Sequence, residues 1–286
     1  MNGRKICITA DCVCDLSDDI LKEHNIEIVY FYIVTDTGVF RDVDEITADN
    51  IFEYQSSGGR SETRSAPPDD FAGFFRRKLR RCDEIIHIAV SSKVSRSVSH
   101  CYEAKELLGE DGDRLHIFDS EHLSTGMGIL ALRAAELAEE GRDAAYILDE
   151  LEDMRDKIST TFIANNAEYL YINGKVSKGL KNICNLFSIH PVLEVKDGVL
   201  KLKTVEIGNY EKSMQRYIRK QLKHSDDINK SLLFITHAGC SVNDLKLVKR
   251  EVNRIMSTNI TGAVKASATI SVNCGPRTVG VFYANK

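Results

Sequence analysis

The sequence lacks long apolar runs and an excess of one charge. No apolar run approaches the roughly 18 residues of a membrane-spanning helix, and the run at residues 6–10 is too short for a signal-peptide core. The 38 Lys and Arg residues are balanced by 42 Asp and Glu residues, for a formal net charge of −4. This balance gives no broad positive field for sequence-independent nucleic-acid binding. We therefore expect a soluble cytoplasmic protein with no membrane span and no nucleic-acid partner.

The commonest catalytic motifs are also missing. The sequence contains no Gly-x-Ser-x-Gly elbow, no phosphate loop ending in Lys-Ser/Thr and no His-Glu-x-x-His. Of the eight cysteines only Cys12 and Cys14 are close together, and without a second pair at ligand spacing they favour reduced, buried thiols over a zinc site. Residues 126–131 match the dinucleotide-binding glycine pattern only loosely, because the glycines lie inside a predicted helix. The sequence therefore predicts no metal site and no catalytic residue.

The first half of the chain has the pattern of a parallel sheet. Of the 286 residues, 43% are hydrophobic, which is enough for a sizeable core. Short β-branched runs alternate with amphipathic stretches, as in strands joined by crossover helices. The predicted strands are residues 5–9, 26–32, 84–90 and 114–118, and the predicted helices are about 17–24, 69–79, a stretch after Ser97, 124–140 and 144–157. Two successive helices break the alternation, so we place a domain boundary after residue 157.

The second half follows a different pattern. The Asp197-Gly198 turn between residues 192–195 and 199–207 predicts a β-hairpin, and hence antiparallel pairing. A further segment lies around residues 160–164, and strands are predicted near residues 232–236, 266–272 and 279–283, with helices after Ser177 and at 210–222 and 242–256. We therefore predict two α/β domains, residues 1–157 with a parallel sheet and residues 158–286 with a mixed sheet, and a ligand cleft between them.

Two turns rich in hydroxyl groups are the clearest sign of a binding site. Residues 63–68 include Thr63 and Ser65, and residues 91–97 contain four serines directly after a predicted strand. The carboxyl ends of parallel strands usually form the binding crevice of such a sheet. Hydroxyl and backbone N–H groups at a helix start suit an anion, particularly a carboxylate. Helix capping by Ser95 or Ser97 explains one of these serines but not the others.

Seven segments resemble, in the same order, the motifs of one known family. In the first half they are residues 9–16 (resembling Asp-Ser-x-x-Asp-Leu), 63–71 (Thr-Ser-Gln-Pro-Ser-x-x-x-Phe), 91–97 (Ser-Ser-x-Leu-Ser-Gly-Thr) and 118–128 (the next strand end and helix). In the second half they are residues 170–177 (Leu-x-x-Gly-Gly-Arg-Ile-Ser), 189–198 (Lys-Pro-Ile-Leu and a hairpin) and 273–280 (His-x-Gly-Pro-Gly-x-x-Gly). The chain thus resembles the DegV family of bacterial fatty-acid-binding proteins nearly end to end.

The resemblance implies a lipid carrier without a cofactor. It implies that one long-chain fatty acid is buried in an apolar tunnel between the two domains, and that a separate fatty-acid kinase receives its carboxylate and makes an acyl phosphate for phospholipid synthesis. The carrier itself would supply no catalysis. The resemblance assigns the carboxylate to Thr63 and Ser95, assisted by Ser92, Ser65, Arg96, Ser97 and Asn273, and it places Gly174, Lys175 and Gly275 at the pocket between the domains.

The chain departs from the family pattern at residues expected near the head group. Asn273 stands where the family has a histidine, and an amide cannot carry the proton or the charge of an imidazole. Arg96 replaces a glycine and adds bulk and a fixed positive charge. Arg96 could pair with the carboxylate or a larger anionic head, or it could obstruct the pocket. We therefore expect a diverged member whose ligand is shorter, branched or otherwise unusual.

Two other interpretations compete with the carrier. One is an enzyme, a phosphotransferase or hydrolase acting on a small anion in the same cleft, in which Asp11, Asp15 and Asp119 would surround a divalent metal. The other is an interaction module that docks an acidic partner on the basic run at residues 76–81. The simpler interpretation of the basic run is a solvated helix face. The simpler interpretation of Asp11 and Asp15 is that they hold turns and helix caps.

Overall fold

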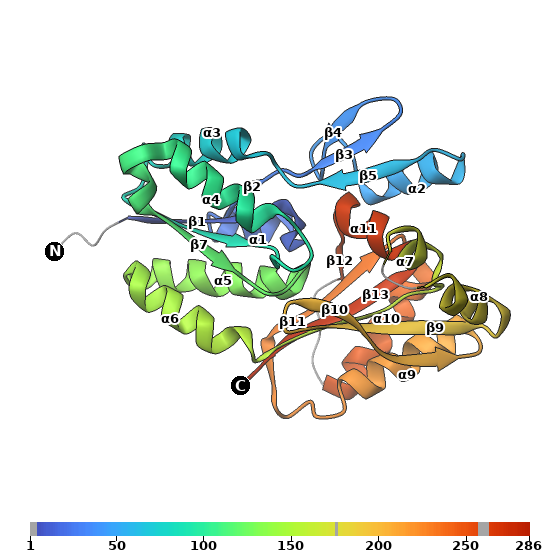
Figure 1. Cartoon of the computed structure of the whole chain (residues 1–286). Helices are drawn as coiled ribbons and strands as arrows, with labels where there is room; N and C mark the ends of the chain where they lie inside the picture. The colour runs from blue at the N-terminus through green and yellow to red at the C-terminus, as the bar shows by residue number, and fades with distance from the viewer. Residues whose placement is uncertain (1–4, 175–176, 257–262) are drawn as a thin grey trace.

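The computed structural model describes residues 5–174, 177–256 and 263–286, which form two large sheets and one small sheet (Figure 1). The first large sheet is parallel, in the order β2-β1-β6-β7. Its strands are β1 (Ile6–Asp11), β2 (Glu27–Val29), β6 (Glu84–Ala89) and β7 (Leu115–Asp119). Its connections contain the 3-10 helices η1 (Cys12–Cys14) and η2 (Gly109–Arg114) and the helix α1 (Asp18–Glu23). The predicted parallel sheet in the first half is confirmed.

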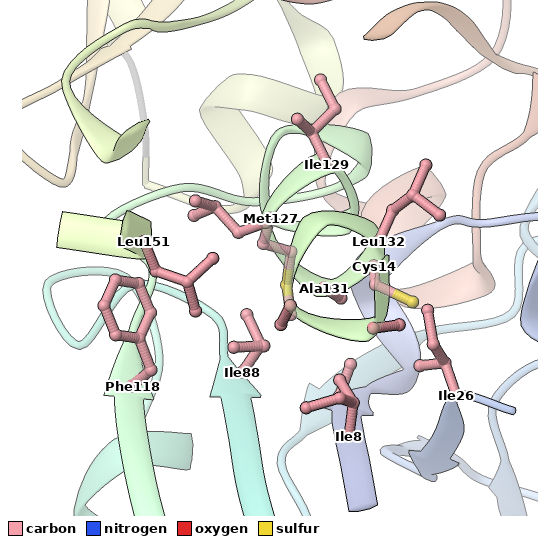
Figure 2. Close-up of a cluster of buried hydrophobic side chains, with 14 of the residues drawn as sticks. Ile8, Cys14, Ile26, Ile88, Phe118, Met127, Ile129, Ala131, Leu132 and Leu151 are labelled. Atoms are coloured by element: carbon pink, nitrogen blue, oxygen red, sulfur yellow. The ribbon is translucent and has the colours of Figure 1, made fainter. Parts of the chain in front are cut away.

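Helices cover both faces of this sheet, because the strands alternate apolar side chains to either side. On one face lie α3 (Pro68–Lys78) and α4 (Ser97–Leu108), whose Phe71, Phe75 and Cys101 pack with Ile85 and Leu115. On the other face lie α5 (Thr125–Glu139) and α6 (Ala144–Arg155). Figure 2 shows that packing, in which Met127, Ala131 and Leu151 surround Ile8, Ile88 and Phe118.

The second large sheet is mixed, in the order β10-β9-β8-β13-β11-β12. Only β11 and β12 pair in parallel. Its strands are β8 (Ile158–Ile163), β9 (Ile189–Lys196), β10 (Val199–Ile207), β11 (Ile228–Ala238), β12 (Ala263–Lys265) and β13 (Thr278–Asn285). The predicted hairpin is confirmed, because β9 and β10 pair across Asp197 and Gly198, which both have positive φ, as a tight two-residue hairpin turn requires.

Helices also cover both faces of the mixed sheet. The helices α9 (Tyr210–Gln221) and α10 (Val242–Met256) pack on Ile163, Ile235 and Val281. On the opposite side lie α7 (Glu168–Ile172), α8 (Lys178–Leu186) and α11 (Ala268–Cys274) (Figure 1). The chain leaves α6 at Arg155 and enters β8 at Ile158, and a division into domains after residue 157 remains our prediction.

A small antiparallel sheet departs from the predicted pattern. Residues 26–32 do not form one strand: β2 ends at Val29, and β3 (Tyr32–Thr35) belongs to a separate sheet with β4 (Val39–Arg41) and β5 (Ser61–Arg64). This sheet and α2 (Ala48–Ser56) reach over the second half and pack on α11. Figure 1 shows α11 below this sheet. The excursion was not predicted, and it forms part of the site described below.

The predicted strand at residues 266–272 is also wrong, because residues 268–274 form the helix α11. Thr269, Ile270 and Val272 give the segment a β-branched pattern typical of a strand. Two carboxylates distant in sequence supply partners for the backbone N–H groups that begin the helix: Asp42 accepts from Ala268 and Thr269, both at 2.8 Å, and Asp15 accepts from Ser267 at 2.9 Å. Tertiary hydrogen bonds thus override local propensity here.

Within the described ranges, no helix has both the length and the apolar character to cross a membrane.

Candidate functional site

A cavity of about 970 Å³ lies between the two large sheets. This volume is at the upper end of the range of about 300–1,000 Å³ that is usual for small-molecule sites. All three sheets contribute to its wall: Val90 follows β6, Phe162 and Phe282 lie on β8 and β13, and Val34 and Thr63 lie on β3 and β5. The predicted cleft between the two halves is therefore present, and the small sheet forms one of its sides.

Most of the cavity wall is apolar. Its apolar side chains come from both halves of the chain and include Val13, Phe31, Val34, Val39, Val90, Val94, Leu123, Phe162, Leu200, Ala238, Ala266, Ile270 and Phe282. On β8 and β13, the residues facing the cavity alternate with those that face α9 and α10, so Phe162 and Phe282 line it while Ile163 and Val281 do not. A wall of this kind suits a hydrocarbon chain, since each buried methylene contributes about 0.8 kcal/mol.

The two hydroxyl-rich turns meet at this cavity. Thr63, Ser65, Ser92, Ser95 and Arg96 all line it. The first two come from β5 and the turn after it, and the others come from the loop that links the carboxyl end of β6 to α4. Because β5 belongs to the small sheet, the fold brings these two segments together from different layers.

The loop after β6 is held in place by two aspartate carboxylates, of which Asp11 is buried. Asp11, at the end of β1, accepts the Val90 N–H at 2.8 Å and the Ser97 hydroxyl at 2.9 Å. Asp119, at the end of β7, accepts the Ser92 N–H at 3.2 Å. These bonds fix the loop without using the side chains of Ser92 and Ser95.

The same loop is tied to the hairpin of the second half. Ser91 donates its hydroxyl to the carbonyl of Gly198 at 2.7 Å, and the Lys93 ammonium donates to the carbonyl of Asp197, also at 2.7 Å. Two features that the sequence shows separately, the serine-rich turn and the Asp197-Gly198 hairpin, are therefore in contact.

The hydroxyl of Ser95 is available to donate a hydrogen bond. Its Oγ accepts the backbone N–H of Ser97 at 3.2 Å, which orients the side chain. Its hydroxyl hydrogen has no acceptor among the described residues. Since Ser95 lines the cavity, that hydrogen is available to an acceptor in it.

The other predicted site residues are placed differently. Asn273 lines the cavity from α11, and its amide Nδ2 donates to the carbonyl of Thr269 at 2.8 Å. Ser97 is fully buried and does not line the cavity, and its hydroxyl donates a hydrogen bond to Asp11. Gly174 and Gly275 do not line it either, and a Cβ at Gly275 would lie 2.6 Å from the Tyr169 ring. Lys175 lies outside the described residues.

Several polar residues of the cavity were not predicted, including Tyr32, Asp70, His100 and His237. His100 had a detectable signal: it lies four residues after Arg96 at the start of α4, on the same face of the helix. Burial and the nearby Lys265 ammonium lower the pKa of His237.

The three aspartates proposed for a metal site do not act together. Asp11 and Asp119 bind the loop described above, and Asp15 accepts the Ser124 hydroxyl at 2.5 Å and the Ser267 N–H. The described part of the chain contains no group of three or more His, Cys, Asp or Glu side chains able to hold a metal ion. Burial raises the pKa of Asp15 to about 7, although both serines favour its charged form.

Cys14 and part of the basic run at residues 76–81 are held by contacts within the fold. Burial raises the pKa of Cys14 to about 12, so this thiol stays protonated and unreactive near neutral pH. In the basic run, Lys78 pairs with Glu27, and Arg76 donates to the carbonyl of Leu107. The face that carries the run is therefore partly used within the fold.

Comparison with known proteins identifies the family. A family model with the description "Uncharacterised protein, DegV family" matches residues 5–286. This chain belongs to the DegV family. A DegV domain-containing protein from Caldanaerobacter subterraneus subsp. tengcongensis is 25% identical over 288 residues, covering 99% of both chains.

Solved DegV structures share the whole fold. A fatty-acid-binding DegV family protein from Thermus thermophilus superposes with a TM-score of 0.85 at 24% identity, covering 99% of this chain and 100% of the other. A stearic-acid-binding protein from Eubacterium ventriosum has a TM-score of 0.85 at 20% identity, covering 98% of each chain. At these identities the similarity shows the fold, so the ligand has to be argued from the cavity of this DegV protein itself.

Proposed function

We propose that this DegV protein binds one long-chain fatty acid in the cavity between its two large sheets. The observation that carries the proposal is the composition of the wall: a large apolar cavity with hydroxyl groups gathered from two turns. An acyl chain would gain affinity from the apolar wall. A carboxylate taken from water must be hydrogen-bonded or paired, and the hydroxyl groups meet that need.

The carboxylate in this proposal is held by Thr63 and Ser95. Both line the cavity, and the hydroxyl hydrogen of Ser95 is free of other described partners. Ser92 and Ser65 lie in the same two segments and complete the set of hydroxyls. Arg96 lines the cavity as well, and its exposed guanidinium would balance the negative charge.

We further propose a carrier rather than an enzyme, with a separate fatty-acid kinase as the partner that phosphorylates the carboxylate for phospholipid synthesis. Three solved relatives with the same fold are described as fatty-acid-binding proteins, from Thermus thermophilus, Bacillus subtilis and Thermotoga maritima. The aspartates that an enzyme could use, Asp11, Asp15 and Asp119, accept hydrogen bonds from backbone and serine groups. This favours the carrier over the phosphotransferase or hydrolase alternative.

Mass spectrometry of the purified protein, in its native state and after organic extraction, tests the proposal. We expect about one fatty acid per chain, whose mass gives the acyl length. A protein that yields no lipid and takes up none of a series of added fatty acids from 10 to 18 carbons would overturn it.

A further inference from the structure

We infer that His100 takes up a proton when the anionic head of the ligand binds, so that protonated His100 is part of the head-group site. The inference rests on the proposed function, because it concerns the same cavity. It adds to the hydroxyls and Arg96 a further group of the head-group site, and it names the proton that this group takes up.

The proton on Nδ1 of His100 is assigned by its neighbours. Nδ1 lies 2.8 Å from the carbonyl oxygen of Ala66 and 3.1 Å from Ser65 Oγ. A carbonyl oxygen can only accept a hydrogen bond, so Nδ1 must carry a hydrogen to satisfy it. Ala66 is fully buried, and an unpaired carbonyl there would be costly. Ser65 Oγ then accepts from the same N–H, and its own hydroxyl hydrogen is left for the cavity.

This assignment determines what Nε2 can do. Nε2 has no hydrogen-bond partner among the described residues, and His100 lines the cavity. In the neutral ring, with its hydrogen on Nδ1, Nε2 carries only a lone pair and repels a carboxylate. In the imidazolium form Nε2 becomes a donor with a positive charge. An ionised head group at Nε2 therefore requires one additional proton, taken from solvent on binding.

Besides the two histidines, three charged side chains from the described part of the chain line the cavity. Arg64 comes from β5, Arg96 is the residue directly before α4, and Asp70 lies on α3, where it accepts a hydrogen bond from Tyr32 of β3, which also lines the cavity. The two arginines attract the head group, and Arg64 already pairs with Glu62. The Asp70 carboxylate repels an anionic head group, so the positive groups of the cavity must outweigh it.

The second half of the chain does not supply this charge. Asn273 lines the cavity, but its amide donates to the Thr269 carbonyl and cannot ionise. His237 also lines the cavity, but burial and Lys265 lower its pKa and favour the neutral ring. Among the described residues that line the cavity, His100 is therefore the imidazole suited to pair with an anion.

Calorimetry with two probes of equal chain length tests the inference. Dodecanoate stays ionised in water between about pH 6 and 9, because carboxylic acids titrate near pH 4, whereas 1-dodecanol has no charge. Titrations in two buffers of different ionisation enthalpy count the protons taken up. We expect the dodecanoate affinity to fall with rising pH, by up to about tenfold per pH unit where one proton is taken up. The dodecanol affinity should not change with pH.

The variant His100→Gln keeps an amide in place of the ring but cannot titrate. It should bind dodecanoate with a flat pH profile and no proton uptake. His224→Gln, an exposed histidine away from the cavity, is the matched control and should behave like the unaltered protein. If the unaltered protein binds dodecanoate without proton uptake, or if His100→Gln keeps the pH profile, the inference is overturned and the proposed function stands. Binding of neither probe would overturn the proposed function itself.

Discussion

Two walls of the cavity are fixed in place in different ways. The carboxylates that hold the hydroxyl-bearing loop after β6 come from its own half, because Asp11 and Asp119 end β1 and β7, the two strands on either side of β6. Two hydrogen bonds to the Asp197-Gly198 hairpin are added from the second half. The helix α11, which lines the cavity through Ile270 and Asn273, is instead held by carboxylates from the other half of the chain, Asp15 and Asp42. The carboxylates that hold the loop after β6 therefore belong to the same half of the chain as the loop, whereas those that hold α11 belong to the other half.

The carboxylates that hold α11 are buried away from water. Asp15 and Asp42 are 4% and 0% exposed, and burial raises the pKa of both. The free energy that Asp15 contributes to folding at α11 should therefore depend on pH. Ligand affinity should depend on chain length after a substitution in the apolar wall, but not after a substitution in the head-group wall, where the hydroxyl groups lie. Three predictions, in order of decreasing effect, test this contrast.

The largest effect should come from Asp15→Asn. The pKa of Asp15 is about 7 in the fold against an ordinary 3.8. The folded state thus holds this proton more tightly than the unfolded chain, so the contribution of Asp15 to stability falls as pH rises from about 4 to 7 and is constant above. The difference corresponds to roughly 4 kcal/mol, at about 1.36 kcal/mol for each pH unit.

Urea unfolding of the unaltered protein and of Asp15→Asn at several pH values measures this. Asparagine can still accept the Ser267 N–H and tolerates the left-handed backbone of residue 15, where φ is 49°. The unfolding free energy of the variant, relative to the unaltered protein, should rise by up to that amount between pH 4 and 7. Asp19→Asn, on the exposed face of α1, is the control. A constant difference across this range would show that Asp15 titrates alike in both states.

The contrast between the walls also explains what the sequence could predict. The hydroxyl-rich loop was predictable because its position follows from a local rule: it comes directly after the buried strand β6, and parallel strands end at a common edge. The Asp197-Gly198 hairpin was predictable for the same reason, since its turn is encoded in two adjacent residues.

Features that depend on distant residues were missed. The helix α11 has the composition of a strand, and it is helical because Asp42, 226 residues away, accepts the Ala268 N–H. The break after Val29 was missed because residues 26–32 are aliphatic or aromatic apart from Glu27, and nothing local indicates that Tyr32 enters another sheet. The role of His100 depends on the carbonyl of Ala66, which only the fold brings to its ring. The local sequence pattern does not indicate contacts between residues that are far apart in the chain.

An intermediate effect is expected from filling the apolar wall. Ala238 is buried at the end of β11 and lines the cavity. Ala238→Leu adds three carbon atoms there and should exclude about three methylenes of a long ligand, which costs roughly 2–3 kcal/mol, or about a hundredfold in affinity. Dissociation constants for acids of 8 to 18 carbons measure it. The loss should be confined to the longer acids, and an equal loss for all lengths would mean that residue 238 does not border the acyl chain.

The smallest of the three effects is expected at the head-group wall, from Ser95→Ala. The variant removes the free hydroxyl donor, and a hydrogen bond to a charged group contributes about 1.5 kcal/mol, which is roughly tenfold in affinity. Because this bond is made to the carboxylate, the loss should be the same for every chain length, in contrast to Ala238→Leu. Ser99→Ala, whose hydroxyl donates to the Arg96 carbonyl on the exposed side of α4, serves as the control. A loss that grew with chain length would place Ser95 beside the acyl chain, and the two walls would then no longer divide into a head-group wall and an apolar wall.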